Sequence, residues 1–237
     1  MKKILRCAAF LTLSLVAGAA VAQAPRPAKA GPTVAELRKN FARLAAGTEG
    51  ESEAFINLMH TTPRRLVAYL KTHELSAAGA TNMRINLSAS SRDATHLKVF
   101  TYSYDSGGTR GTVHRPVLQW RNAAGQRFAY VPFEECDFTK IYKLASPGRT
   151  FYLLLGNDRG SGQCGLSQAY VIELKGNYLL LDAAAFDKSA SLILCNVAMR
   201  FDPRRQVLRM TEQEYPFEPT AHDTQLKWQG SSFAETR

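Results

Sequence analysis

The residues of this chain best suited to chemistry surround a glycine-rich tip between two strand-like segments. Asp105, Arg110 and His114 lie within ten residues of one another, around Gly107-Gly108. In a tight hairpin, residues beside the tip face each other about 5 Å apart, so we expect Asp105 to pair with His114. A neighbouring carboxylate favours the charged imidazolium, and glycines let a ligand approach the backbone closely. The segment predicts a polar ligand contact; the structural alternative is a turn in which Asp105 caps its own loop.

A second polar, glycine-rich segment contains Asn157 and Asp158. Their side-chain oxygens could bind a cation or another ligand. The segment lacks the alternating oxygen ligands of a calcium loop, so a plain turn is the alternative. The five histidines show no metal-binding spacing such as His-x-x-x-His. We therefore predict neither a metal site nor a cofactor, and keep Asn157 and Asp158 as candidate ligand-binding residues.

The aspartate at the first tip also suggests an enzyme. Asp105-Ser106-Gly107 matches the Asp-Ser/Thr-Gly motif of aspartic proteases, and Leu154-Leu155-Gly156 matches their hydrophobic-hydrophobic-Gly segment. Those enzymes need two carboxylates that share one proton, and the chain has one such motif, so a symmetric dimer would be required. Tyr104 stands where these proteases prefer an aliphatic residue. A hydrolase using Asp105 is the alternative function, and whether the chain is an enzyme stays open.

The same segment also has the form of a longer motif. From Tyr104 to His114 it follows the pattern aromatic-Asp-Ser-Gly…Gly-Thr…His, and Gln119-Trp120 follows on the next strand. In this respect the chain resembles a group of exported bacterial β-rich proteins, over roughly residues 83–212. The resemblance implies a β-rich fold and export, and it implies no particular activity.

The first residues predict export. Lys2, Lys3 and Arg6 precede an uncharged, mostly apolar run, and Ala20-Val21-Ala22 provides the small residues of a signal-peptidase site. The run is shorter than the roughly 20 apolar residues of a membrane-spanning helix, so a retained anchor is the weaker alternative. No later stretch is long and apolar enough to span a membrane, so we expect no transmembrane segment in the mature chain. The predicted location is the periplasm or the extracellular medium.

Three cysteines remain after the predicted cleavage: Cys136, Cys164 and Cys195. The exported compartment permits disulfides, and an odd number leaves one thiol unpaired. We expect a Cys164–Cys195 bridge, because sheet neighbours could bring the two Cα atoms close enough. The other two pairings stay open.

The elements that must position these residues are of two kinds. Thr33 and Glu36 have the spacing of a helix capping box, and apolar residues follow on one helical face as far as Gly47. Further short helices are expected over 51–59 and from Thr62-Pro63 onward, with Pro at the first helical position. From residue 83 the pattern changes to period two, and the hairpin formed by 113–121 and 127–131 is clear.

The predicted fold class is α+β, mainly β: short N-terminal helices followed by a large antiparallel meander, sandwich or barrel-like. Single strands are expected over 150–155, 169–174 and 192–201, among others. The predicted divisions are a signal peptide (1–22), a Pro-rich tether (23–32), a helical segment (33–80), an antiparallel β domain (81–215) and a loosely ordered tail (216–237).

The formal net charge of +10 falls to +7 when the three cations of the predicted signal peptide are removed. The remaining cations are scattered, with Arg64-Arg65 and Arg204-Arg205 as the densest pairs, and aromatic residues do not alternate with them. This pattern argues against nucleic-acid binding and favours weak attraction to anionic surfaces. The function we expect is binding, without catalysis, of an envelope or extracellular partner: a small ligand, a glycan or an envelope protein.

Overall fold

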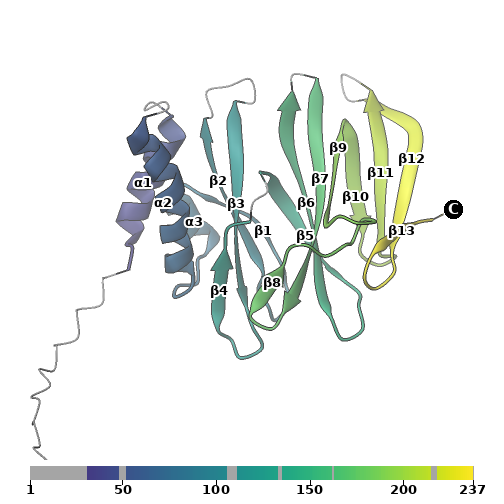
Figure 1. Ribbon diagram of the computed structural model, residues 1–237, viewed down its shortest axis with the longest axis horizontal. Helices are drawn as coiled ribbons and strands as arrows, with labels where there is room; N and C mark the ends of the chain where they lie inside the picture. Colours follow the sequence, from purple (N-terminus) through teal and green to yellow (C-terminus); the bar gives the residue numbers. More distant parts are fainter. Residues whose placement is uncertain are drawn as a thin grey trace, which may run out of the picture. The chain divides into compact units, whose positions relative to one another are not determined.

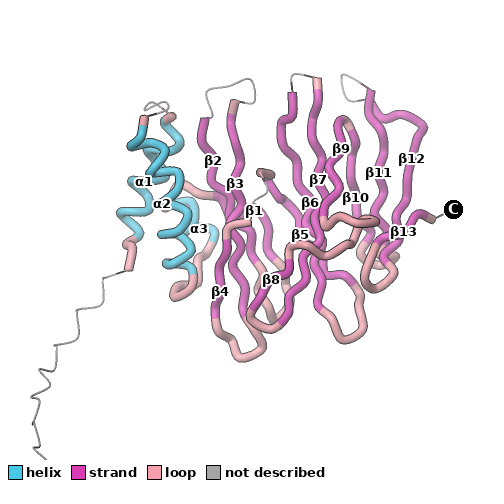
Figure 2. The backbone as a smooth tube through the Cα atoms, viewed as in Figure 1, coloured by secondary structure: helices cyan, strands magenta, loops and turns pink. Residues whose placement is uncertain are grey.

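A computed structural model describes residues 31–47, 52–105, 111–132, 135–161, 163–214 and 218–236. The predicted signal peptide, residues 23–30 of the predicted tether and the candidate Arg110 lie outside the described residues. Within these described residues, three helices come first: α1 (Val34–Ala46), α2 (Glu53–Leu70) and α3 (Ala77–Asn82). Thirteen strands follow in the same described part of the chain, and Figures 1 and 2 show their arrangement.

The first helix begins and ends where the sequence predicts. The Thr33 hydroxyl accepts a hydrogen bond from the Glu36 amide at 3.3 Å, and the Glu36 carboxylate accepts one from the Thr33 amide at 2.9 Å. Gly47 ends the helix with a φ of +59°, which favours glycine. The predicted break before Pro63 is wrong, because α2 runs through it. The buried face continues on both sides, with Leu58 and Leu66, and its burial outweighs the cost of about 3 kcal/mol for an internal proline.

The strands form three antiparallel sheets, and within each sheet strands that follow one another in the chain pair with one another, except that β9 pairs with β7. The predicted meander and the mainly β fold class are therefore confirmed. Sheet A contains β1 (Asn86–Ser90), β2 (Lys98–Asp105), β3 (Thr112–Arg121) and β4 (Arg127–Tyr130). Sheet B contains β5 (Asp137–Leu144), β6 (Thr150–Ser161), β7 (Cys164–Lys175), β8 (Tyr178–Leu180) and β9 (Ser191–Cys195). Sheet C contains β10 (Val197–Asp202), β11 (Val207–Glu214), β12 (Glu218–Trp228) and β13 (Phe233–Glu235).

The helices and the three sheets are stacked in chain order (Figure 1). One apolar cluster, which includes Phe41 and Phe100, joins the helices to sheet A. A second, which includes Trp120 and Tyr152, joins the other face of sheet A to sheet B. A third, which includes Phe151 and Trp228, joins the other face of sheet B to sheet C. Sheets A and B are thus covered on both faces, whereas sheet C packs on one face.

Two predictions about the C-terminal part are wrong. The single strand expected over 192–201 is divided at Asn196, whose φ of +52° ends β9 and begins β10 in another sheet. The tail predicted to be loosely ordered forms β12 and β13. Trp228 and Phe233 are buried against sheet B, and the residues between them form the turn from β12 to β13. Few apolar residues are enough to hold these strands, because successive side chains of a strand point to opposite faces and only one face of sheet C is buried.

A partly buried hydrogen-bond network joins the β1–β2 connection of sheet A to sheet B. The hydroxyl of Tyr152, on β6, donates to the carboxylate of Asp93 at 2.5 Å, and the hydroxyl of Thr95 donates to the same carboxylate at 2.6 Å. Burial opposes the charge of Asp93, but the hydrogen bonds from Thr95, Tyr152 and Ser91 outweigh it and lower the pKa of Asp93 to about 2. The ionised carboxylate is therefore part of the packing between the two sheets.

This network predicts a dependence of stability on pH. The folded-state pKa of Asp93 lies below its ordinary value of 3.8, so its contribution is complete above about pH 4 and is lost as the pH falls toward 2. We expect Asp93→Asn to lower the free energy of unfolding by about 1–2 kcal/mol at pH 6 and by much less at pH 2. Urea unfolding of both proteins between pH 2 and 6 measures the difference. A difference that does not change with pH would contradict this assignment.

Candidate functional site

The glycine-rich tip does not have the pairing that we predicted. The ladder of β2 and β3 places Asp105 opposite Thr112, and His114 opposite Ser103. Asp105 therefore pairs with a residue two positions before the expected His114, and the unpaired tip between the strands is shorter than predicted. The Ser103 hydroxyl and His114 Nδ1 lie 2.9 Å apart, within hydrogen-bond distance. Asp105 is exposed at the end of β2, and its Cβ lies close to Gly47 at the end of α1.

Asn157 and Asp158 lie within β6 and not in a loop. Asn157 Oδ1 accepts a hydrogen bond from the Ser167 hydroxyl at 3.1 Å, and Asp158 Oδ1 accepts one from the Arg159 amide at 2.7 Å. The Asn157 oxygen therefore serves a contact between β6 and β7, and the Asp158 oxygen serves a local contact within β6. Among the residues that the structure describes, no three His, Cys, Asp or Glu side chains are grouped so that they could hold a metal ion.

The two segments of the protease hypothesis belong to different sheets. Asp105 ends β2 in sheet A, whereas Leu154-Leu155-Gly156 lies in β6, which pairs with β5 and β7 in sheet B. Ser106 and Gly107 lie outside the described residues. The structure therefore does not pair the two segments, and a hydrolase using Asp105 stays a prediction.

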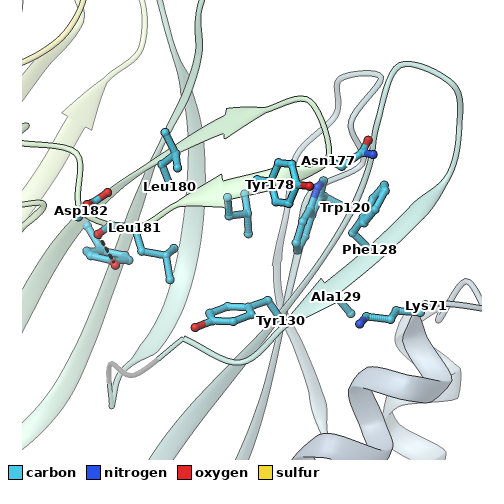
Figure 3. A pocket seen from close by; sticks show the side chains of 12 residues that line it. Lys71, Trp120, Phe128, Ala129, Tyr130, Asn177, Tyr178, Leu180, Leu181 and Asp182 are labelled. Carbon is cyan, nitrogen blue, oxygen red and sulfur yellow. Dashed lines mark hydrogen bonds between the residues drawn. The ribbon is translucent and has the colours of Figure 1, made fainter.

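A cavity that sequence reasoning missed lies between sheets A and B. It has a volume of about 730 Å³ and lies between the β3–β4 hairpin and the β7–β8 hairpin (Figure 3). Most of its lining is aromatic or aliphatic, with Lys71, Asn177 and Asp182 as polar members. The aromatic residues that line it are Trp120, Phe128, Tyr130, Tyr170 and Tyr178.

Specific contacts hold the two hairpins in place around this cavity. At the tips, Asn122 Nδ2 donates to Asn177 Oδ1 at 2.7 Å, which links the two turns. Asn122 is itself held by Gln126, whose backbone N–H donates a hydrogen bond to Asn122 Oδ1 at 2.9 Å. On the sheet B side, the Tyr170 hydroxyl donates to the Leu181 carbonyl at 2.8 Å. The cavity is therefore formed by ordered turns and strands.

The chemistry of the cavity is that of a binding pocket for a ring. Trp120 and Phe128 stack with ring centroids 5.6 Å apart and form one wall. The Trp120 Nε1 donor is buried and has no hydrogen-bond partner among the described residues. Tyr130 is 37% exposed and Tyr178 is 72% exposed, which is unusual for large side chains of a folded sheet. Flat apolar walls fit a ligand that contains a flat ring.

A smaller cavity of about 410 Å³ lies between α2 and the β2–β3 pair. Its lining includes Tyr104 and Arg115 from the sheet. Burial opposes the charge of Arg115, but the hydrogen bond with Tyr104 and the charge of Glu135, 2.7 Å away, outweigh it and raise the pKa of Arg115. The Arg115 guanidinium is thus already bound to a carboxylate of the chain, so the larger cavity is the better candidate site.

Single-sequence patterns could not identify the larger cavity. Trp120 and Phe128 appear in the sequence as core residues of a hairpin, and Tyr178 as the first residue of a short strand. The site exists because sheets A and B stack with these two hairpins side by side, about fifty residues apart in the chain. The sequence analysis singled out Gln119-Trp120 only as part of the predicted resemblance to an exported β-rich group, and not as part of a cavity.

Comparison with known proteins identifies no relative. No protein-family model matches the chain, and no curated protein or solved structure matches it. The resemblance to a group of exported β-rich proteins therefore stays a prediction. Within the described residues, no helix is both long and apolar enough to cross a membrane.

Proposed function

We propose that this chain is an exported binding protein whose ligand occupies the cavity between sheets A and B. The observation that supports the proposal is a cavity whose aromatic lining includes the exposed side chains of Tyr130 and Tyr178. Exposed apolar surface gathered in a hollow is typical of a ligand-binding groove. The signal-like N-terminus and the Cys164–Cys195 disulfide support export, because disulfides persist in oxidising compartments.

The lining defines the kind of ligand. A volume of about 730 Å³ is that of a site for a small molecule or for one part of a larger one. Aromatic walls favour a flat ring. Lys71 at the rim adds attraction for an anionic group. We therefore expect an amphipathic ligand with a flat ring and an anionic substituent.

A fluorescent probe of this chemistry tests the proposal. 8-Anilinonaphthalene-1-sulfonate has a flat ring system and a sulfonate acceptor, and its fluorescence rises in apolar pockets. We expect Tyr178→Ala to weaken its binding about 5-fold, because a stacked aromatic pair contributes roughly 0.5–1.5 kcal/mol. The melting temperature should hardly change, since Tyr178 is 72% exposed. Fluorescence titration and thermal unfolding provide the two measurements.

Ile193→Ala is the matched control. Ile193 is 50% exposed on β9 and is not part of the cavity lining, so its removal should leave probe binding unchanged. Equal weakening by both substitutions would mean that the probe binds exposed apolar surface in general. In that case the proposed site is wrong.

A further inference from the structure

The outer face of sheet C has an unusual distribution of charge. Side chains on one face of this sheet, such as Phe201 and Leu208, pack against sheet B. By strand alternation and register, Arg200, Arg209 and Lys227 are on the opposite face, and all three are exposed. This face belongs to the last layer of the stack and no other sheet covers it (Figure 1).

The cations on this face are not neutralised as they are elsewhere in the molecule. Arg200 is directly opposite Arg209 in the β10–β11 ladder, an arrangement of like charges that destabilises a sheet. Within the described residues, neither arginine has a carboxylate within ion-pair distance. By contrast, Glu74 in the helical part accepts hydrogen bonds from Lys98, Arg121 and Arg127. The fold of sheet C gains nothing from the Arg200–Arg209 pair, which points to a role outside the fold.

The two acidic residues on this face with described side chains are engaged by other donors. Asp202 accepts hydrogen bonds from the amides of Arg204 and Arg205 at 2.9 and 3.1 Å, which fixes the β10–β11 turn. The Asp223 carboxylate accepts one from the Thr211 hydroxyl at 2.6 Å. Asp202 moderates the positive charge near Arg205 and Arg209 and leaves a cationic surface overall.

The surface is also concave. A groove of about 510 Å³ is lined by three cationic residues, two neutral polar residues and one apolar residue: Arg204, Arg205, Lys227, Gln225, Thr236 and Val207. The guanidinium groups and the ammonium offer donors in several directions, and the amide and hydroxyl add neutral polar contacts. A groove with these donors suits sulfate, phosphate or carboxylate groups attached to a chain.

We propose that the outer face of sheet C binds an anionic polysaccharide. The exposed large apolar side chains of the described residues include none from sheet C. An anchor for insertion into a lipid bilayer and an aromatic platform for nucleic-acid bases are therefore both missing from the described part of this face. A polysaccharide with charged substituents can bind without an apolar anchor and without an aromatic platform. The binding depends on charge and polar contacts, and it is separate from the aromatic cavity.

Heparin, a sulfated polysaccharide, is the probe for the test. We expect the full chain to bind it, with an affinity that falls roughly 50-fold between 50 and 200 mM salt if about four cations take part. Arg200→Gln combined with Arg209→Gln should weaken binding at least 10-fold. The same double variant should melt at an equal or slightly higher temperature, because it removes the repulsion between the two arginines.

Lys39→Gln combined with Lys140→Gln is the control. These two exposed cations lie on α1 and β5, so the variant loses the same charge without altering sheet C. It should weaken heparin binding less than 2-fold. Equal weakening by both double variants would show attraction to net charge alone and overturn the proposal. Equally tight binding to phosphatidylglycerol vesicles or to a single-stranded oligonucleotide would also overturn it. Heparin should not displace the fluorescent probe from the aromatic cavity, which separates this test from that of the proposed function.

Discussion

Replacing both Cys164 and Cys195 with Ser is expected to lower the free energy of unfolding by about 3–4 kcal/mol. The disulfide joins the beginning of β7 to the end of β9, with Cα atoms 5.1 Å apart and a sequence separation of 31 residues. It confirms the pairing expected from the sequence. The main effect of such a bridge is to restrict the unfolded chain, and a loop of this length gives the stated magnitude.

Urea unfolding of the oxidised protein and of the double variant measures this loss. Cys136 is buried and forms no disulfide, so thiol counting on the unfolded, unreduced mature chain should give one. Reducing agent should destabilise the wild-type protein as much as the double substitution does, and it should leave the variant unchanged. A variant as stable as the oxidised protein would show that the bridge does not support the fold. The expected loss also implies that the chain is most stable in an oxidising compartment, in agreement with the proposed export.

Gly156→Ala is expected to destabilise the protein by about 3 kcal/mol or more. A Cβ at this position would lie 2.5 Å from the Asp137 carbonyl oxygen, 2.6 Å from the Cys136 sulfur and 2.8 Å from the Phe138 Cα. Two of these three atoms belong to the backbone of β5, so the strand itself would have to move. Thermal and urea unfolding measure the loss.

Gly79→Ala is the matched control, because the atom nearest its new Cβ is the flexible end of Leu75 at 2.8 Å. Alanine also suits α3 better than glycine, and we expect a change within about 1 kcal/mol. If Gly156→Ala were as mild as the control, the close contact between β5 and β6 would not be real. A large loss would give Gly156 a packing role that explains the Leu154-Leu155-Gly156 segment without a protease.

Local signals predicted most of the elements. The hydrogen-bonding requirements of a helix start explain why Thr33 and Glu36 fixed the beginning of α1. The alternation of apolar residues and a glycine-containing turn defined the β3–β4 hairpin, in which Trp120 is opposite Phe128. These patterns depend on residues near one another in the chain, and tertiary contacts do not alter them here.

Predictions failed where distant contacts decide the structure. Pro63 is tolerated inside α2 because the apolar face on both sides of it packs on sheet A. Asn196 divides an apolar run because its side chain accepts a hydrogen bond from the Gly165 amide and its own amide donates one to the Gly165 carbonyl. Gly165 lies on β7, about thirty residues earlier in the chain. The aromatic cavity needs the stacking of two sheets, which no local pattern encodes. The candidates Asp105 and Asn157 were chosen from local glycine-rich segments, and the structure places them in different sheets.

The stacking of layers in chain order makes this a quasi-linear assembly. Each apolar cluster joins two adjacent layers, so the energetics resemble those of a repeat array with nearest-neighbour coupling. Sheet C corresponds to the capping repeat of such an array, since it has one apolar face and one polar face. A chain of this design can gain or lose a terminal layer during evolution and keep its interior interfaces intact. The polar outer face of whichever layer comes last is then free to evolve toward a new partner.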